Sequence, residues 1–311
     1  MTIDGDAMGT TWTVQVDIRG EEQETQLLND AIAGLLESTE QQMSTWRSDS
    51  EISKFNSGLS TNWIPIGPRI ATVLRQAQAV SRATSGAFDV TVLPLVELWG
   101  FTSQELVTNA PPAKALTIIR QATGFQKLQV SNERDEVRKL HHRTQVDLSA
   151  LAKGYAVDLV CGLLGEMKYT NYLVEIGGEL RGHGDSKKGR PWRVGLELPI
   201  VGKSELGDAV DLPNNALATS GDYRNFLELD GQRYAHIINP RTGHPIKQQG
   251  IAVSVLAPTC MEADAWATAL TVLGIDQGLQ LAEQEKLAVQ FRVYLEGELV
   301  QQSSAQWPKN P

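Results

Sequence analysis

The spacing of hydrophobic side chains divides the chain into predicted strands and helices. Residues 10–18 alternate between apolar and polar positions, which predicts a half-buried strand. Residues 21–36 place apolar side chains three and four positions apart, which predicts that a helix follows this strand directly. The same two periods predict the later elements of the first half: helices at 69–84, 113–123 and 150–168, and a pair of short strands at 126–130 and 136–140.

The second half of the chain is richer in strand-like segments, and helical periodicity returns only at 260–273 and 275–285. The predicted strands of this half lie at 171–176, 191–198, 208–211, 216–219, 225–229, 233–237, 251–256 and 287–295. Strands in runs, joined by turns that contain Gly and Asn, favour antiparallel pairing with helices packed on the sheets. We therefore expect an α+β fold with mixed, largely antiparallel sheets.

Length and composition are those of a folded protein. The 311 residues allow a single domain over 1–311 or two closely packed subdomains. The 28 Lys and Arg residues face 37 Asp and Glu residues, and the net charge of −9 argues against a nucleic-acid partner, because phosphate backbones attract basic surfaces. No segment approaches the roughly 18 consecutive apolar residues of a membrane-spanning helix.

Two features bear on the cellular compartment. Residues 1–20 have neither a basic start nor an apolar core, so they are not a signal peptide. The protein is then either cytoplasmic or deprived of its export segment. Cys161 and Cys260 are 99 positions apart and have no partner at metal-ligand spacing. We expect both to be small buried residues, with a disulfide as the alternative in an exported protein.

The segment 146–155, V-D-L-S-A-L-A-K-G-Y, is a candidate anion site. Asp147 and Ser149 stand just ahead of the predicted helix, and Lys153 lies in its first turns. Backbone N–H groups and the helix dipole favour negative charge there, so a lysine is out of place unless an anionic ligand compensates it. The alternative is a capping Ser or Asp with a solvated lysine.

The segment 261–270, M-E-A-D-A-W-A-T-A-L, is a candidate metal site. Asp264 and Thr268 are four positions apart and share one helix face. A carboxylate and a hydroxyl suit Mg²⁺, which completes its octahedron with water and substrate oxygens. The alternative is that Thr268 bonds back to the main-chain carbonyl of Asp264.

His236 lies near the end of a strand that runs into the turn P-R-T-G at 240–243. It could act as a base or contact a flavin edge, although the residue taken alone favours a structural role. Glycine-rich stretches at 175–184 and 218–223 do not match G-x-G-x-x-G between a strand and a helix, so a dinucleotide-binding fingerprint is not supported.

Seven blocks of the sequence, taken together and in order, resemble the ApbE family of FAD:protein FMN transferases over nearly the whole chain. Each block alone is weak, but their common order is specific. They are M-G-T-T-W (8–12), M-S-T-W-R-S-D-S-E-I-S-K-F-N (43–56), S-G-A-F-D-V-T-V (85–92), V-D-L-S-A-L-A-K-G-Y-A-V-D (146–158), A-T-S-G-D-Y-R-N-F (218–226), H-I-I-N-P-R-T-G-H-P (236–245) and the helix with Asp264 and Thr268.

This resemblance implies an ApbE-like fold whose active site lies between two halves of the chain. It also implies Mg²⁺-dependent transfer of FMN from FAD, as a phosphoester, to a Thr or Ser hydroxyl of a partner protein, with release of AMP. The implied Mg²⁺ ligands are Asp264, Thr268 and the main-chain oxygen of Ala150. The residues implied for the FAD pocket are Met8, Trp46, Ala87, Phe88, Asp89, Asp147, Lys153, His236 and Ile237.

Several questions stay open at the level of sequence. Asp147, Asp264 and His236 are all candidates for the general base. An FAD pyrophosphatase that yields free FMN and AMP, or a flavin-binding module without chemistry, would use the same pocket. A redox flavoenzyme would need an electron-donor site, and no nicotinamide fingerprint is present. Other family members carry Tyr or other residues where this chain has Trp46, and this position could influence whether a hydroxyl or water attacks.

The resemblance also implies partners and a location. Acceptors in the family are flavin-carrying subunits of membrane redox complexes, such as the Na⁺-translocating NADH:quinone oxidoreductase. Members are commonly exported and held at the bacterial inner membrane as lipoproteins, by a lipid on an N-terminal cysteine. We therefore expect a periplasmic protein that reaches the membrane only through such an anchor, with a cytoplasmic location as the alternative.

Overall fold

The computed structural model describes residues 1–17, 22–102, 109–200, 202, 205–223, 226–229, 232–247, 250–295 and 298–309. Three of the segments predicted from sequence have a terminal residue outside these described residues. The terminal residues are Ile18, Glu21 and Asn225.

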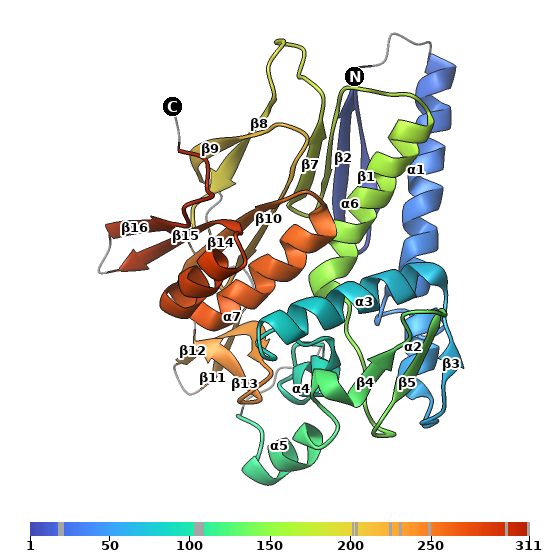
Figure 1. Cartoon of the computed structure of the whole chain (residues 1–311), viewed down its shortest axis with the longest axis vertical. Coiled ribbons are helices and arrows are strands. Elements are labelled where there is room, and N and C mark those ends of the chain that lie inside the picture. Colours follow the sequence, from blue (N-terminus) through green and yellow to red (C-terminus); the bar gives the residue numbers. More distant parts are fainter. Residues whose placement is uncertain are drawn as a thin grey trace.

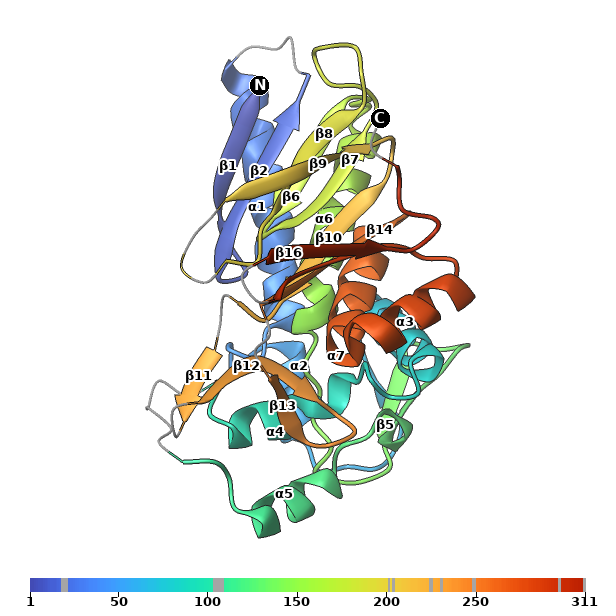
Figure 2. The same ribbon diagram turned by 90° about the vertical axis from the view of Figure 1, so that its left-hand side faces the viewer.

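An eight-stranded sheet forms the centre of the molecule, and all its neighbouring strands run antiparallel (Figures 1 and 2). The strand order is β1-β2-β6-β7-β10-β14-β15-β16, so the β1–β2 pair from the start of the chain joins strands of the second half through the pairing of β2 with β6. The bounds are β1 Thr2–Ala7, β2 Thr10–Val16, β6 Tyr172–Ile176, β7 Glu179–His183, β10 Ala216–Gly221, β14 Ile251–Ala257, β15 Ala288–Leu295 and β16 Glu298–Ser303.

Three smaller sheets surround the large one. The β8-β9 hairpin covers one face of the large sheet, where Val194, Leu196 and Leu212 pack with residues of β6, β10 and β14 (Figure 2). The other two, β3-β5-β4 and β11-β12-β13, lie near the opposite end of the molecule from the N-terminus. The bounds are β3 Ile64–Pro65, β4 Leu128–Val130, β5 Glu136–Lys139, β8 Trp192–Glu197, β9 Leu206–Leu212, β11 Phe226–Leu229, β12 Gln232–Asn239 and β13 His244–Lys247.

Helices cover the other face of the large sheet. Long helices α1, α6 and α7 lie across it, and α3 packs beside α6 and α7 (Figure 1). The apolar faces of these helices and of the sheet form the two largest clusters of buried side chains. The bounds are α1 Glu22–Met43, α2 Glu51–Ser57, α3 Pro68–Ala83, α4 Leu93–Leu98, α5 Ala113–Arg120, α6 Ser149–Glu166 and α7 Cys260–Gln284, with short 3₁₀ turns at Val90–Val92 and Phe125–Lys127.

The α+β fold expected from sequence is confirmed, and most of the expected elements form within a few residues of their expected bounds. The expected helices 260–273 and 275–285 are one kinked helix, α7, with its break at Gly274, whose φ is 74°. Cys161 and Cys260 are both buried and free, so the expectation of two small core residues is confirmed and the disulfide does not form. In the described ranges, no helix combines the length and the apolar character needed to cross a membrane.

Candidate active site

The close contact between α6 and α7 is made possible by Gly154. A Cβ at this position would come within 2.7 Å of the carbonyl carbon of Cys260 and 2.9 Å of Asp264 Cβ, so only glycine fits. The Gly154 N–H donates a 3.1 Å hydrogen bond to Asp264 Oδ2. Asp264 is 5% exposed, and in the described chain nothing donates a hydrogen bond to its Oδ1. One oxygen of this buried carboxylate is therefore fixed by α6, and the other is available.

Asp158 holds the start of α7 in place from one turn further along α6. Its two carboxylate oxygens accept hydrogen bonds of 2.9 Å each from the N–H groups of Cys260 and Met261. The Asp158 carboxylate also forms an ion pair with Arg181 of β7 at 2.5 Å. These bonds satisfy N–H groups that would otherwise have no partner at a helix start, and they fix the position of Asp264 relative to α6.

Lys153 lies beside the same junction and forms an ion pair with Glu179, at 2.5 Å between Nζ and Oε1. Burial lowers the pKa of Lys153, but the carboxylates of Asp264 and Glu179 raise it by more, so the net shift is upward. Burial raises the pKa of Glu179, and Lys153 opposes this shift. Lys153 is therefore a charged, oriented side chain, which contradicts the alternative of a solvated lysine.

The helix start in front of Lys153 differs in detail from the expected cap. Leu148 occupies the N-cap position of α6 without a side-chain bond, and Ser149 is the first helical residue. Asp147 Oδ1 accepts a 2.9 Å hydrogen bond from the Ser149 N–H, and the Asp147 N–H donates to the carbonyl of Val90 at 2.7 Å. Asp147 thus stabilises the turn that enters α6 and ties it to the segment after α3.

The donors at the α6–α7 junction fit a divalent cation. Thr268 lies one turn after Asp264, is half-buried, and makes no side-chain hydrogen bond within the described residues, so the bond back to the Asp264 carbonyl is not formed. Ala150 lies one turn before Gly154, in the first turn of α6. Hard oxygen donors beside a buried carboxylate suit Mg²⁺. No group of three or more His, Cys, Asp or Glu side chains that could hold a metal occurs in the described ranges.

Asp147 and His236, 89 positions apart in the chain, interact electrostatically in the fold. Burial raises the pKa of Asp147, and the charge of His236 on β12 acts in the opposite direction. Glu97, at the exposed side of α4, is a further neighbour, because Asp147 adds to the effect of burial in raising the pKa of Glu97. Sequence analysis placed Asp147 and His236 in one site, but it did not identify Glu97.

The segment at residues 87–89 lies against β12. Ala87 packs with Ile237 and Val272 in a small apolar cluster, while Phe88 is 3% exposed and belongs to the main core. Asp89 is buried, and its Oδ1 accepts hydrogen bonds of 2.7 Å from both the N–H and the hydroxyl of Thr91. With these side chains engaged inside the protein, the main chain of the segment is the part that can contact a ligand.

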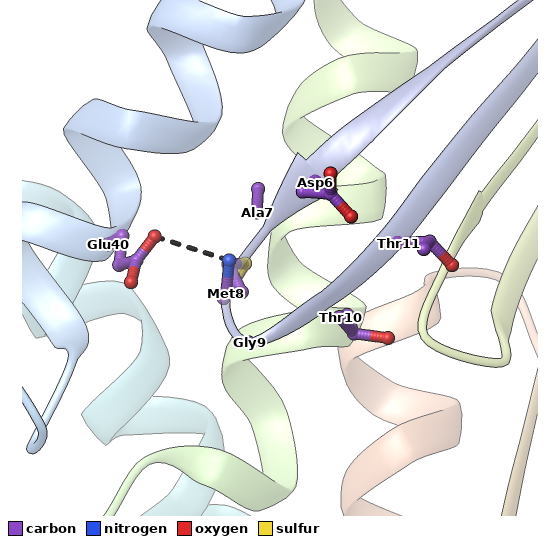
Figure 3. Close-up of a pocket in the computed structure, with 7 residues that line it drawn as sticks. All are labelled: Asp6, Ala7, Met8, Gly9, Thr10, Thr11 and Glu40. Atoms are coloured by element: carbon purple, nitrogen blue, oxygen red, sulfur yellow. Dashed lines mark hydrogen bonds between the residues drawn. The ribbon is translucent and has the colours of Figure 1, made fainter.

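Met8 and Trp46 lie on the side of the site formed by β1, β2 and α1. Met8 has a left-handed conformation, with φ of 54°, and its N–H donates to Glu40 Oε2 at 3.2 Å (Figure 3). Met8 and Glu40 border a pocket of about 430 Å³. Trp46 follows α1 and is 74% exposed. The pocket is lined by Asp6, Ala7, Met8, Gly9, Thr10, Thr11 and Glu40, so Trp46 does not line it.

Asn56 braces the chain that leads into the site, and sequence analysis did not assign it a role. Its side-chain amide donates to the carbonyl of Val146 and accepts from the N–H of Val146, both at 2.8 Å. Lys139 Nζ in turn donates to the carbonyls of Asn56 and Gly58, at 3.1 and 2.7 Å. The residue directly before Asp147 is thereby fixed to α2, a helix ninety residues earlier in the chain.

Glu179, Gly154 and Asp158 are also absent from the sites that sequence analysis proposed. A weak signal existed for Gly154, because a glycine inside a helix directly after a candidate lysine has a cost that needs a structural reason. Glu179 follows two consecutive glycines, Gly177 and Gly178, both with positive φ. That pattern predicts a turn, but it does not predict which charged residue faces Glu179.

The family comparison covers most of the chain. The model of the ApbE family matches residues 8–291, a range that contains both α6 and α7. The FAD:protein FMN transferase of Vibrio cholerae is 39% identical over 287 residues, which make up 92% of this chain and 85% of that protein. The FAD:protein FMN transferase of Klebsiella pneumoniae is 37% identical over 298 residues, 95% of this chain and 85% of that protein.

Solved structures give the same relationship in three dimensions. The flavin transferase ApbE from Vibrio cholerae superimposes with a TM-score of 0.89 at 37% identity, covering 99% of this chain and 97% of that one. The apo form of the Pseudomonas stutzeri flavinyl transferase ApbE has a TM-score of 0.87 at 35% identity, covering 98% of this chain and 95% of that one. The two chains therefore share the fold of this one over nearly its whole length.

Proposed function

The chain belongs to the ApbE family, and on that premise we propose that it is a transferase that moves the FMN part of FAD to a Thr or Ser hydroxyl of a partner protein, releasing AMP. The observation that carries this proposal is the junction of α6 and α7, where Asp264 is fixed by Gly154 and the oriented ammonium of Lys153 lies beside it. A positive side chain next to a buried carboxylate can hold a cation and a pyrophosphate together.

Asp264, Thr268 and the main-chain oxygen of Ala150 are the residues we propose to hold Mg²⁺. The ion, when bound, would neutralise charge on the pyrophosphate oxygens and so favour attack on phosphorus. Lys153 would bind another phosphate oxygen of the same pyrophosphate; this proposal is supported by the ion pair with Glu179, which holds Lys153 Nζ at this junction.

The flavin half of FAD would lie against the segment at residues 87–89 and β12. Main-chain groups at Ala87, Phe88 and Asp89 would contact the edge of the ring system, and His236 and Ile237 would border it from β12, where Ile237 packs with Ala87. Met8 would close the pocket from the β1–β2 turn. The exposed ring of Trp46 offers a flat apolar surface for stacking on the flavin or the adenine.

The acceptor hydroxyl would attack the phosphorus of the FMN half, and the bond from this phosphorus to the bridging oxygen would break as AMP leaves. We propose His236 as the group that takes the hydroxyl proton, because the carboxylate of Asp147 interacts electrostatically with it and would stabilise the imidazolium that forms. Asp147 and Asp264 are the other candidates, and of these Asp264 is engaged by Gly154 and by the proposed cation.

The fate of the flavin tests this function. The protein is incubated with FAD, Mg²⁺ and an acceptor domain from a flavin-carrying subunit of a membrane redox complex. We expect the acceptor to become heavier by one FMN unit and fluorescent after denaturing electrophoresis, with AMP released in equal amount. An acceptor with alanine in place of the target threonine is the control and should stay unlabelled.

Two other outcomes would replace the proposal. Rapid release of FMN without any acceptor, and no labelling with acceptors from several redox complexes, would indicate an FAD pyrophosphatase. FAD that stays intact through prolonged incubation with Mg²⁺ would indicate a flavin-binding module. A transferase needs an acceptor hydroxyl that attacks the phosphorus in place of water. The hydroxyl competes with water only when it is held in line with the phosphorus and water is excluded from the pocket.

The partners and the location are further parts of the proposal. We propose flavin-carrying subunits of membrane redox complexes, such as the Na⁺-translocating NADH:quinone oxidoreductase, as acceptors. We also propose that the protein works in the periplasm, held at the inner membrane by a lipid anchor. Cell fractionation of the full-length gene product would test the location, and its recovery in the cytoplasm would contradict it.

A further inference from the structure

Glu179 is a buried charged residue for which the proposed chemistry, as described so far, has no use beyond its contact with Lys153. It is 4% exposed and lies at the first position of β7, directly after the turn formed by Gly177 and Gly178. In this turn Glu175 Oε1 accepts a 2.6 Å hydrogen bond from the Gly178 N–H. The position of the Glu179 side chain is therefore set by the sheet and not by solvent.

Only one of the two carboxylate oxygens of Glu179 is used. Oε1 contacts Lys153 Nζ at 2.5 Å, whereas Oε2 is buried and has no hydrogen-bond partner in the part of the chain that the structure describes. A buried carboxylate oxygen without a partner is costly, and such atoms in folded proteins call for a ligand, a water or an ion. The charge of Asp264 also acts on Glu179, where it adds to the effect of burial in raising the pKa of this carboxyl.

The charges of this group do not balance. Burial raises the pKa of both Glu179 and Asp264, so the charges are counted at mildly alkaline pH, where both carboxylates are ionised. Lys153 then contributes one positive charge against two negative charges, and the group carries one net negative charge. A divalent cation would turn this into one net positive charge, which suits an anionic pyrophosphate. Without Glu179 the group would be neutral before the cation arrives and would attract it less.

We propose that Glu179 is a positioning residue of the FMN-transfer site, one that orients Lys153 and supplies the second negative charge that makes the site selective for a divalent cation before FAD binds. This inference rests on the proposed function. It assigns to Glu179 opposite effects on the two ligands, because the same negative charge attracts the cation and repels the pyrophosphate.

The test compares Glu179→Gln with the wild-type protein in two binding experiments that need no turnover. Glutamine keeps the shape of the side chain and an oxygen that can accept from Lys153, but it removes the charge. We expect the dissociation constant for Mg²⁺ alone, measured by titration calorimetry at mildly alkaline pH, to rise by roughly 10–100-fold, the usual range for residues that support metal ligands. Binding of inorganic pyrophosphate in EDTA should be equal or tighter.

Two further variants complete the design. Glu166→Gln makes the same chemical change at the exposed far end of α6 and should leave both affinities at the wild-type values. Glu179→Asp keeps the charge with a shorter side chain and should recover most of the Mg²⁺ affinity lost in Glu179→Gln. Thermal unfolding of each variant shows whether it is folded under the binding conditions.

The outcomes separate this inference from the proposed function. Unchanged Mg²⁺ affinity in Glu179→Gln would overturn the role of Glu179. A parallel loss of affinity for Mg²⁺ and for pyrophosphate would also overturn it and would show that Glu179 is merely structural. If instead the two affinities change as expected but the wild-type protein never labels an acceptor, the proposed function fails while the charge role of Glu179 stands.

Discussion

Lys153 lies near the start of a helix and nevertheless keeps its positive charge. It lies in the first turns of α6, where the helix dipole disfavours a positive charge, and yet the neighbouring carboxylates keep the pKa of its ammonium above the usual value against the effect of burial. Asp264 and Glu179 thus secure a charge that the helix alone would weaken. This charge remains available for a phosphate over the whole physiological pH range.

Replacing Lys153 by methionine should therefore weaken FAD binding or turnover by at least about tenfold, roughly 1.4 kcal/mol, the lower range for a charge-assisted hydrogen bond. Methionine keeps the length of the side chain and removes the charge. The measurement is FAD affinity by flavin fluorescence, together with the rate of acceptor labelling. Lys114→Met, in the first turn of α5 and exposed, is the matched control. Wild-type affinity and wild-type turnover in Lys153→Met would together contradict this role.

A second buried lysine gives a pH-dependent prediction. Burial lowers the pKa of Lys139 to about 8, from 10.5 for the free side chain. Between these two values the unfolded chain binds more protons than the folded one, so the free energy of unfolding gains a contribution that grows as the pH rises. At a pH above 10.5 the full contribution to the free energy of unfolding is present, and at a pH below about 8 it is absent.

This contribution can be isolated with Lys139→Met, which cannot titrate. As the pH rises from about 8 to 10.5, the stability of the wild-type protein relative to this variant should increase by up to about 3 kcal/mol. Urea denaturation at a series of pH values measures the difference, and the variant corrects for all other groups. A difference that stays constant with pH would show that Lys139 is charged in the fold, supported by its bonds to Asn56 and Gly58.

At the residue scale, sequence could name the groups that carry chemistry but not the groups that face them. Asp147, Lys153 and Asp264 belong to blocks with recognisable local patterns. Glu179 is adjacent to Lys153 only because β7 lies beside α6, a relationship between distant segments that no local period expresses. The amide bonds of Asn56 to Val146 span ninety positions and were beyond prediction for the same reason.

At the scale of elements, the junction of α6 and α7 depends on a missing side chain. Gly154→Ala would place a methyl group 2.7 Å from the carbonyl carbon of Cys260 and would push Asp264 away from the N–H that fixes it. We expect a loss of about 1–3 kcal/mol in the free energy of unfolding, which is typical of overpacking, together with weaker Mg²⁺ binding. Thermal unfolding and metal titration measure the two effects.

Gly162→Ala provides the control for this prediction. Gly162 lies two turns later in α6, is exposed, and a Cβ there would meet nothing within 4 Å. Alanine should stabilise the helix by about 0.5–1 kcal/mol, because it loses less conformational freedom than glycine. If Gly154→Ala stabilised the protein as Gly162→Ala is expected to do, α6 and α7 would not be in tight contact at Gly154.

The elements that sequence analysis predicted are those with strong periodicity, and the missed ones have physical reasons. β16 is an edge strand with the polar sequence E-L-V-Q-Q-S, and β7 has Arg, Gly and His among its five residues, so neither shows a clean alternation. Helix α2 has only seven residues, too few to establish a helical period. The break of α7 at Gly274 was visible, because glycine interrupts a helix where its φ becomes positive.

At the scale of the whole molecule, the site joins segments from most of the chain. Met8 comes from its start, α6 from its middle and α7 from near its end, and the large sheet places them together by pairing β2 with β6 and β10 with β14. Strand order cannot be derived from periodicity. The site between two halves was therefore expected only through the family resemblance, and the local patterns alone would have left separate anion and metal motifs.

Because the proposed Mg²⁺ ligands come from both α6 and α7, metal binding should stabilise the whole fold. A ligand that binds only the folded protein adds about 2.7 kcal/mol to the free energy of unfolding at a concentration one hundred times its dissociation constant. We therefore expect the unfolding temperature of the wild-type protein to rise with added Mg²⁺ and to fall back in EDTA. Calorimetry with and without Mg²⁺ measures the change.

Asp264→Ala is the decisive variant for this effect. It removes a buried carboxylate but keeps the Cβ, and alanine is a strong helix former, so the protein should remain folded, while the increase in unfolding temperature with Mg²⁺ disappears and turnover falls by orders of magnitude. The loss of stabilisation and the loss of turnover should occur together, because both depend on the same bound ion. A variant that still gains stability from Mg²⁺ as the wild-type protein does, and still labels an acceptor at the wild-type rate, would show that the ion binds elsewhere.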